Sequence, residues 1–287
     1  MVTGSVASIA VVIVEIALLL CISAVTLLLS FNMTGLGPTR RGFFCDDESI
    51  SYPYRTDTVS DSVLIACFIG VPVIIMVFVE TLHACIFRSR EGKQISCQIF
   101  LSHLYRAVGS FLFGQMSSSL VMETTKLFAG RLRPNFLSVC DIDLDLVNCS
   151  QGHVEIDDST CRNDDKSMVM DARKSFPSGH ASLAVFTIVF LSIYLHERFI
   201  WARKVRIFIP TIQTGLLIAG VYICISRMSD NRHHAGDIIA GAVLGLVFAL
   251  LVKLLLPCAR VRRAHRRPLD TSGSLTTVNS DIIDMKF

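Results

Sequence analysis

The chain has 287 residues, of which 52% are hydrophobic and only 18% are charged, and its formal net charge is +3. Soluble proteins carry charge on about a quarter of their residues, so this composition excludes an ordinary soluble domain and indicates an integral membrane protein. The basic residues are scattered and form neither a continuous stripe nor a binding motif, so we expect no nucleic-acid partner.

Six apolar segments follow one another along the chain, each near the roughly 20 residues that a helix needs to cross a bilayer. Backbone groups in lipid must be hydrogen-bonded within their own segment, which makes helices the expected structure. The first segment lacks the positively charged leader of a signal peptide, and we expect it to be retained. The sequence thus predicts an all-α integral membrane protein with six transmembrane helices, at 6–31, 62–87, 106–125, 181–196, 205–226 and 238–256.

Lysines and arginines in the short connections predict the orientation of these helices. The second connection contains "RSREGK", the fourth contains "ERFIWARKVR", and the sixth helix is followed by "CARVRRAHRR". All three lie on one side if the helices alternate, and the positive-inside rule makes that side cytoplasmic, with both termini. We expect a membrane domain over 1–257, outer loops at about 32–61, 126–180 and 227–237, and a basic, then polar and disordered, cytoplasmic tail at 258–287.

Two features of the outer loops agree with this orientation. Asn148 begins the glycosylation sequon Asn-Cys-Ser, whereas the sequon at Asn32 lies so close to the membrane that we expect it to be unused. Four cysteines also lie in the outer loops, where disulfides persist: Cys45, Cys140, Cys149 and Cys161. The pairings Cys140–Cys149 and Cys149–Cys161, or free thiols, are all compatible with the sequence.

Alternating helices bring three polar stretches to the same outer face: the end of the third helix, the start of the fourth and the connection between the last two. Ser178 and Gly179 begin the fourth helix, where free backbone N–H groups and the helix dipole favour an anion. Arginine and lysine bind phosphate oxygens, and the cations on this face are Lys126, Arg131, Arg133 and Arg227. These groups together predict a site for a phosphoryl group.

Two histidines and a carboxylate complete the predicted site. His180 begins the fourth helix, and His233 precedes Asp237 by four residues. On a helical turn this spacing places both side chains on one face, so we expect Asp237 to hold the His233 ring in one tautomer and leave a nitrogen free to attack phosphorus. The adjacent His233 and His234 could instead suggest zinc, but no further His or Cys has a useful spacing, so we expect no metal.

These residues form three ordered motifs: Lys126-x6-Arg133-Pro134, then Pro177-Ser178-Gly179-His180, then Ser226-Arg227-x5-His233-x3-Asp237. The pattern resembles the three-part signature of the type 2 phosphatidic acid phosphatase superfamily. The stretches "RGFFCDDESISYPY" and "GRLRPNFLSVCD" are similar to those of its integral-membrane lipid phosphate phosphatases. The resemblance covers about residues 5–257.

The resemblance implies metal-independent hydrolysis of lipid phosphate monoesters, with the site on the extracellular or luminal side of a membrane, most simply the plasma membrane. It implies four substrates: phosphatidate, lysophosphatidate, ceramide 1-phosphate and sphingosine 1-phosphate. By family role His233 is the nucleophile that forms a phosphohistidine, Asp237 orients it, and His180 is the general acid and base. The phosphate would be held by Lys126, Arg133, Ser178, Gly179 and Arg227.

Some assignments remain open at the level of sequence. Arg131 could bind phosphate or contact lipid headgroups, His234 has no role, and homo-oligomers are compatible with the chain. The Gly241-x3-Gly245 pattern indicates close helix packing. A non-catalytic lipid-phosphate-binding scaffold or a transporter is the alternative function, but transporters place polar groups at mid-membrane, whereas here they lie at helix ends.

Overall fold

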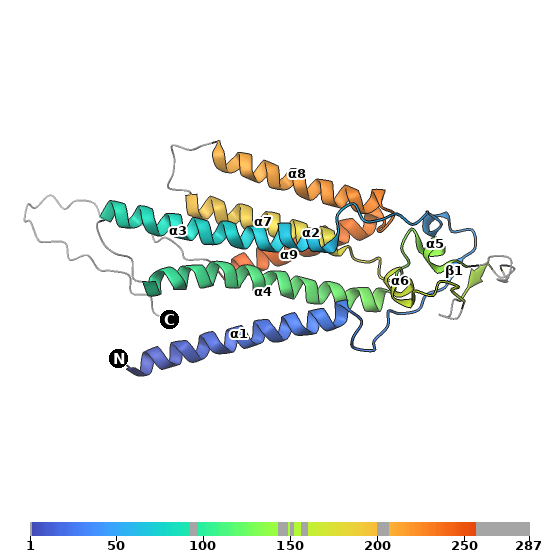
Figure 1. Ribbon diagram of the computed structural model, residues 1–287, viewed down its shortest axis with the longest axis horizontal. Helices are drawn as coiled ribbons and strands as arrows, with labels where there is room; N and C mark the ends of the chain where they lie inside the picture. The colour runs from blue at the N-terminus through green and yellow to red at the C-terminus, as the bar shows by residue number, and fades with distance from the viewer. Residues whose placement is uncertain are drawn as a thin grey trace, which may run out of the picture.

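Long helices lie side by side along the long axis of the molecule (Figure 1). The computed structural model describes residues 2–91, 97–142, 149, 152–155, 160–199 and 207–256. Within these residues the long helices form six rods. The second rod is continuous through three elements: α2 (Asp61–Ile65), the π-helical turn η2 (Ala66–Gly70) and α3 (Val71–Glu91). Each of the other five rods is a single helix: α1 (Val2–Ser30), α4 (Cys97–Ala129), α7 (Gly179–Phe199), α8 (Phe208–Ser229) and α9 (Ala235–Leu255).

The helices expected from the apolar segments are therefore present. Five of the rods in the described part of the chain are long and apolar enough to cross a membrane: the first, the second, α7, α8 and α9. The helix expected at 106–125 lies within α4, which has 33 residues but is more polar than the others. The glycosylation sequon at Asn148 and the tail at 258–287 lie outside the described residues.

Helix α7 is the centre of the bundle, and more of its surface is buried than that of any other candidate span. It packs against α9, α8 and α4. Phe186 and Phe190 from α7 stack on each other and meet Phe111 from α4 in the main apolar core. Because α7 is apolar all round, burial on several sides is the expected outcome.

Glycines bring α9 into direct contact with the backbone of α7. A Cβ atom added to Gly241 would lie 2.2 Å from the Ser178 carbonyl oxygen, and one added to Gly245 would lie 2.3 Å from that of Ser182. Real Cβ atoms do not approach backbone oxygens so closely, so only glycine permits this helix spacing. The close packing expected from the Gly-x3-Gly pattern is confirmed.

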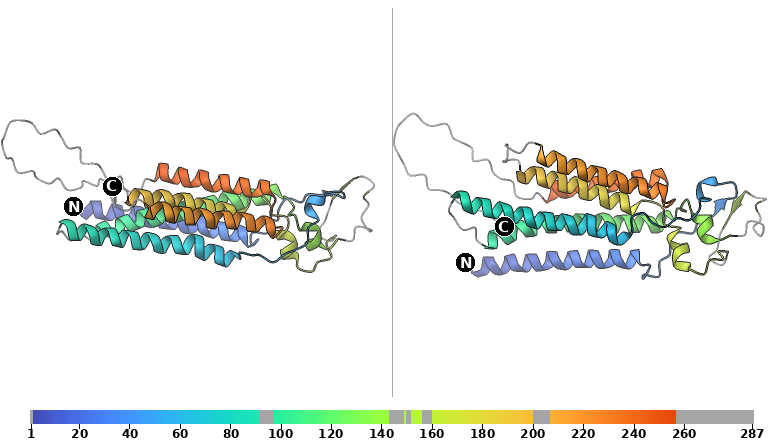
Figure 2. Two further views of the ribbon diagram at one scale, coloured as in Figure 1. Left: turned by 90° about the horizontal axis from the view of Figure 1, so that it is seen from above. Right: turned by 45° about the horizontal axis from the view of Figure 1, so that its top comes forward.

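The described parts of the loops at 32–61 and 126–180 fold into a small cap at one end of the bundle (Figure 2). The cap contains η1 (Glu48–Ile50), α5 (Phe136–Cys140), α6 (Lys166–Asp171) and the antiparallel pair β1 (Phe43–Phe44) and β2 (His153–Val154). Its apolar core is separate from that of the bundle and includes Phe43, Ile50, Phe136 and Val169. At the opposite end of the bundle, α1 begins and α9 ends (Figure 1).

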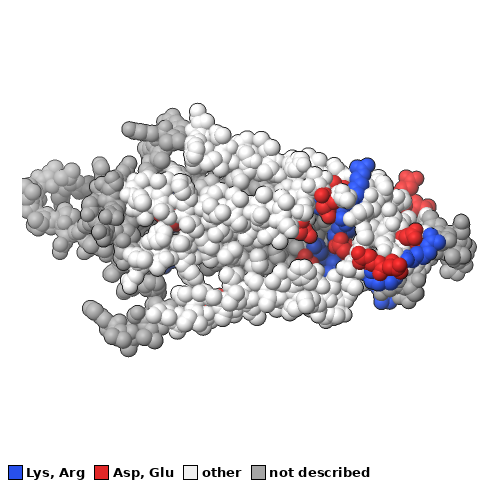
Figure 3. Space-filling model, viewed as in Figure 1, with Lys and Arg blue, Asp and Glu red and all other residues white. Residues whose placement is uncertain are grey.

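Charged side chains separate the cap from the rods. On the face in Figure 3, Lys, Arg, Asp and Glu gather on the cap and where the rods meet it, while the surface of the rods is almost free of charge. Large apolar side chains are exposed along the rods, for example Ile13, Ile74, Ile218 and Leu250. This distribution fits helices surrounded by lipid and a cap surrounded by water.

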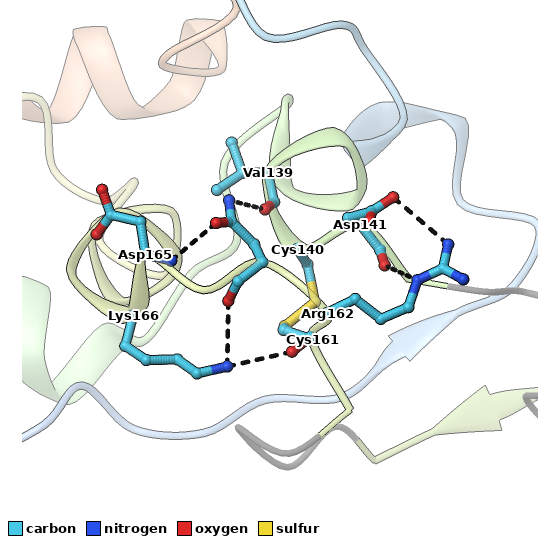
Figure 4. Close-up of a disulfide and its surroundings, with 8 residues drawn as sticks. Val139, Cys140, Asp141, Cys161, Arg162, Asp165 and Lys166 are labelled. Carbon is cyan, nitrogen blue, oxygen red and sulfur yellow. Dashed lines mark hydrogen bonds and ion pairs between the residues drawn. A yellow bond between two sulfur atoms is a disulfide. The ribbon is translucent and has the colours of Figure 1, made fainter.

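Two disulfides cross-link the cap, and they differ from both pairings considered for the sequence. Cys45 bonds to Cys149, and Cys140 bonds to Cys161. The second bond joins the end of α5 to the segment that leads into α6, beside the ion pair of Arg162 with Asp141 (Figure 4). The expected pairings were wrong because both placed Cys149 within its own loop, whereas the pairing of β1 with β2 brings it to Cys45.

The α7–α9 contact predicts that Gly245→Ala destabilises the protein. The added methyl group would overlap the Ser182 carbonyl, and overpacking of this kind costs about 1–3 kcal/mol. We expect a lower melting temperature in detergent. Gly215→Ala, on the side of α8 where nothing lies within 4 Å of an added Cβ, is the matched control and should not lower it. Equal melting temperatures for the two variants would contradict the close contact.

Candidate active site

Backbone hydrogen bonds join the three motifs at the boundary between the rods and the cap. The Ser178 N–H donates to the Asp237 carbonyl at 3.0 Å, which links the start of α7 to the start of α9. The Ser175 N–H donates to the Arg131 carbonyl at 3.0 Å, which links the segment before α7 to the one after α4. The convergence expected from helix alternation is therefore present.

His233 is buried at this junction with one ring nitrogen engaged. The residue is 5% exposed, and its Nδ1 lies 2.7 Å from the carbonyl oxygen of Ser175. A carbonyl can only accept, so Nδ1 carries the proton and Nε2 keeps its lone pair. Burial lowers the pKa of His233 well below its ordinary value, and the positive charges of Arg133 and Lys126 lower it further. The ring is therefore neutral at pH 7.

Asp237 does not make the expected hydrogen bond to His233, because its Oδ2 lies 4.0 Å from the His233 Nδ1. The prediction assumed that both residues lie on one helix, but His233 precedes α9, whose N-cap is His234. As the third residue of the helix, Asp237 instead accepts from the His234 N–H at 3.0 Å, the reach typical of a capping box.

The Asp237 carboxylate contacts both Arg131, for which the sequence left phosphate or lipid headgroups open, and His234, which had no predicted role. Arg131 Nη1 donates to Oδ1 at 2.6 Å, and His234 Nδ1 lies 3.2 Å from Oδ2. Oδ2 further accepts from the Ser175 hydroxyl at 2.6 Å. Arg131 thus belongs to the site through an ion pair, although 43% of its side chain is exposed.

Two of the predicted cations lie close to His233 and are paired with carboxylates. Lys126 Nζ forms an ion pair with Glu123 Oε1 at 2.9 Å. Glu123 is therefore also part of the site. A Cβ added to Gly179 would lie 3.4 Å from the Lys126 Nζ, which places this ammonium at the amino end of α7. Arg133 is 8% exposed and donates to Asp171 at 2.8 Å.

Lys174 is a further buried cation that the motifs did not single out. Burial lowers its pKa, and the charges that act on it are those of Glu123, Lys126, Asp171 and Arg133. Its ammonium donates to the side-chain oxygen of Asn32, just beyond α1. The cationic region therefore extends from the end of α4 to the end of α1.

Arg227, another of the predicted cations, is held by the loop at 32–61 between the first two rods, here called the 1–2 loop. It is 2% exposed and pairs with Asp57 at 2.8 Å and with Asp230 at 2.7 Å. The Val59 carbonyl accepts from Arg227 Nη2 at 3.2 Å and lies 3.2 Å from His180 Nε2. Arg227 and His180 therefore meet at one backbone oxygen.

Asp57 and Arg232 were missed by sequence reasoning. Asp57 bridges Arg227 and Arg232, at 2.8 Å each, and Arg232 lies over the Tyr54 ring. No spacing rule connects the 1–2 loop to the last motif. The sequence signal nearest to Asp57 was the similarity of "RGFFCDDESISYPY" to the family. Among the described residues, no group of three or more His, Cys, Asp or Glu side chains is arranged to hold a metal ion.

Comparison with known proteins identifies the family. Residues 107–259 match the PAP2 superfamily. The chain is 38% identical to phospholipid phosphatase 1 of Rattus norvegicus over 219 residues, which is 76% of this chain and 75% of the relative. It is 37% identical to phospholipid phosphatase 2 of Bos taurus over 214 residues, which is 75% of this chain and 72% of the relative.

Among solved structures, a transmembrane PAP2-type phosphatidylglycerolphosphate phosphatase from Bacillus subtilis aligns with 71% of this chain and 90% of its own, at 18% identity and a TM-score of 0.36. The family match covers more than half of the chain, and both relatives are more than 30% identical over at least two thirds of it. The chain therefore belongs to the PAP2 superfamily, and it is a membrane-embedded phosphatase.

Proposed function

We propose that this protein hydrolyses lipid phosphate monoesters through a phosphohistidine formed on His233. The observation that carries the proposal is the buried, neutral His233 ring, whose Nδ1 is held by the Ser175 carbonyl so that Nε2 is the free nucleophile. The positive charges of Arg133 and Lys126 act on this ring and suit a phosphate dianion beside it.

The reaction proceeds in two displacements at phosphorus. The His233 Nε2 forms a bond to phosphorus while the bond to the lipid oxygen breaks, and His180 gives that oxygen its proton. Water then attacks phosphorus as His180 takes its proton, the bond to Nε2 breaks, and inorganic phosphate leaves. Arg133 and Lys126, together with the first backbone N–H groups of α7 at Gly179, stabilise the charge on the equatorial oxygens.

Ser178 and Arg227 complete the phosphate site. Ser178 is fully buried and immediately precedes α7, where the helix dipole favours an anion. Arg227 shares the Val59 carbonyl with His180, so a phosphate bound to Arg227 lies next to the general acid. The Asp57 carboxylate is paired with the same Arg227 guanidinium. When substrate binds, Arg227 must either contact both Asp57 and the phosphate or lose its contact with Asp57.

Lipid monoesters are the substrate class that this position favours. The site lies where apolar rods meet a charged cap, so an acyl or sphingoid chain can stay in the bilayer while its phosphate reaches His233. The relatives are named phospholipid phosphatases. We propose phosphatidate, lysophosphatidate, ceramide 1-phosphate and sphingosine 1-phosphate as substrates.

We propose that α4 is a sixth span. It runs along the other rods, and its polar residues Ser110, Gln115, Ser118 and Glu123 are buried in the bundle, so its modest hydropathy does not expose them to lipid. With six spans both termini lie on one side of the membrane, and we propose that this side is cytoplasmic because the Lys/Arg-rich connections share it. The two disulfides of the cap support an extracellular or luminal active site, and the plasma membrane is the proposed location.

Replacing His233 by Ala should abolish turnover, because the variant lacks the nucleophile of the proposed mechanism. We expect a loss on the order of 10³-fold or more in kcat, measured as phosphate release from phosphatidate in detergent micelles. Gly215→Ala is the control for handling and reconstitution. Undiminished release by the His233 variant would overturn the mechanism.

Removal of divalent metals should leave activity unchanged, because Lys126, Arg133 and Arg227 provide the positive charge that a metal supplies in other phosphatases. The measurement is kcat for phosphatidate after prolonged incubation with excess EDTA and transfer to metal-depleted buffer. A loss that is restored by Mg²⁺ or Zn²⁺ would refute metal-independent hydrolysis.

Acid should destabilise the wild type more than the His233→Gln variant. The pKa of His233 is lower in the folded than in the unfolded protein, so below about pH 6.5 the unfolded chain binds more protons and unfolding is favoured. We expect the melting temperature of the variant to rise relative to that of the wild type as the pH falls from 7.5 to 5. A constant difference would argue against a buried neutral ring.

A further inference from the structure

The Asp237 oxygen nearest to His233, Oδ2, is already occupied by other groups. A carboxylate oxygen offers about two lone-pair positions, and three polar groups face Oδ2 here. Arg131 Nη1 is on Oδ1 at 2.6 Å, and Oδ2 faces the Ser175 hydroxyl at 2.6 Å, the His234 N–H at 3.0 Å and His234 Nδ1 at 3.2 Å. His233 Nδ1, at 4.0 Å, is outside this set.

Ser175 connects Asp237 to His233, which are not hydrogen-bonded to each other. Its hydroxyl donates to Asp237 Oδ2 at 2.6 Å, and its carbonyl oxygen lies 2.7 Å from His233 Nδ1. Its N–H donates to the Arg131 carbonyl, and Arg131 in turn pairs with Asp237. Ser175 is 0% exposed, so its hydroxyl and its carbonyl are both held by these hydrogen bonds, away from solvent.

We propose that Ser175 is a positioning residue through which Asp237 orients the nucleophile, an inference that rests on the proposed role of His233. Asp237 fixes the Ser175 hydroxyl, the hydroxyl fixes the backbone of residue 175, and the carbonyl of that residue holds the Nδ1 proton of His233. The carbonyl selects the tautomer and aims Nε2 at phosphorus. The hydrogen bonds in the chain polarise one another, which strengthens the hold on Nδ1 as positive charge develops on the ring.

Loss of the hydroxyl has a specific kinetic consequence. Ser175→Ala leaves the carbonyl in place but frees the backbone of residue 175 from Asp237, so the ring of His233 becomes less well aligned. Misplacement of a reacting group by about 1 Å costs on the order of 10²-fold. The cations that bind phosphate are untouched, so kcat falls while KM changes little.

A double-mutant cycle over Ser175→Ala and Asp237→Asn tests the connection. If Asp237 acts through Ser175, the single variants each lose kcat, by about 10–100-fold for Ser175→Ala, and the double variant loses no more than Asp237→Asn alone. The rate of phosphoenzyme formation, measured with ³²P-labelled phosphatidate in a rapid quench, should fall in parallel. If the losses multiply in the double variant, Asp237 acts independently and the proposal is overturned.

Two further variants separate positioning from folding. Ser118→Ala removes another fully buried serine hydroxyl, bonded to Ser182, and should keep kcat within about twofold of the wild type. Ser175→Cys keeps the size of the side chain but donates weakly, so its kcat should lie between those of the wild type and Ser175→Ala even if the Ala variant is unstable. Equal kcat for Ser175→Cys and the wild type, with Ser175→Ala also unchanged, would refute the proposal.

The outcome for His233→Ala distinguishes this inference from the proposed function. An inactive His233 variant together with a fully active Ser175→Ala refutes the connection and leaves the phosphohistidine mechanism standing. An active His233 variant refutes the mechanism itself, whatever Ser175→Ala does.

Discussion

The close contact between α7 and α9 is the constraint on which the rest of the site depends. Gly241 and Gly245 let α9 lie against the carbonyls of Ser178 and Ser182, and the Ser178 N–H donates to the Asp237 carbonyl across the same contact. His180, the proposed general acid, begins one of these helices, and His233, the proposed nucleophile, precedes the other. Because packed helices do not shift smoothly relative to each other, their spacing fixes the distance between the two histidines.

The 1–2 loop contacts both Arg227 and His180, although it lies outside the residues that match the family at 107–259. Asp57 bridges Arg227 and Arg232, the Val59 carbonyl joins Arg227 to His180, and Thr58 donates to Asp230. The cap disulfide from Cys45 to Cys149 joins this loop covalently to the loop at 126–180. The disulfide and these contacts restrain the 1–2 loop, so it can hold Arg227 in place although this part of the loop is not helical.

Much of the architecture could be predicted, because lipid allows few structures for a long apolar segment. Five of the helices lie within a few residues of the expected ranges, whereas α4 begins at Cys97, well before the expected 106. Helix alternation was enough to bring the motifs together. The disulfide pairing could not be predicted, since it depends on how β1 meets β2 in the cap. The contacts of Asp237 were missed because the i, i+4 rule applies only within a helix, and His233 precedes α9. The Ser175 carbonyl is a backbone atom, which no side-chain motif encodes.

The three cations proposed to bind phosphate are each paired with carboxylates in the structure: Lys126 with Glu123, Arg133 with Asp171, and Arg227 with Asp57 and Asp230. Unpaired charges at this burial would cost several kcal/mol, so the carboxylates make the empty site stable. A phosphate dianion must then compete with them, which weakens binding of the ground state. In the proposed mechanism, the transition state has its charge spread over three equatorial oxygens and can engage all three cations together. Under that mechanism the carboxylates favour the transition state over the bound substrate, and this difference accelerates the reaction.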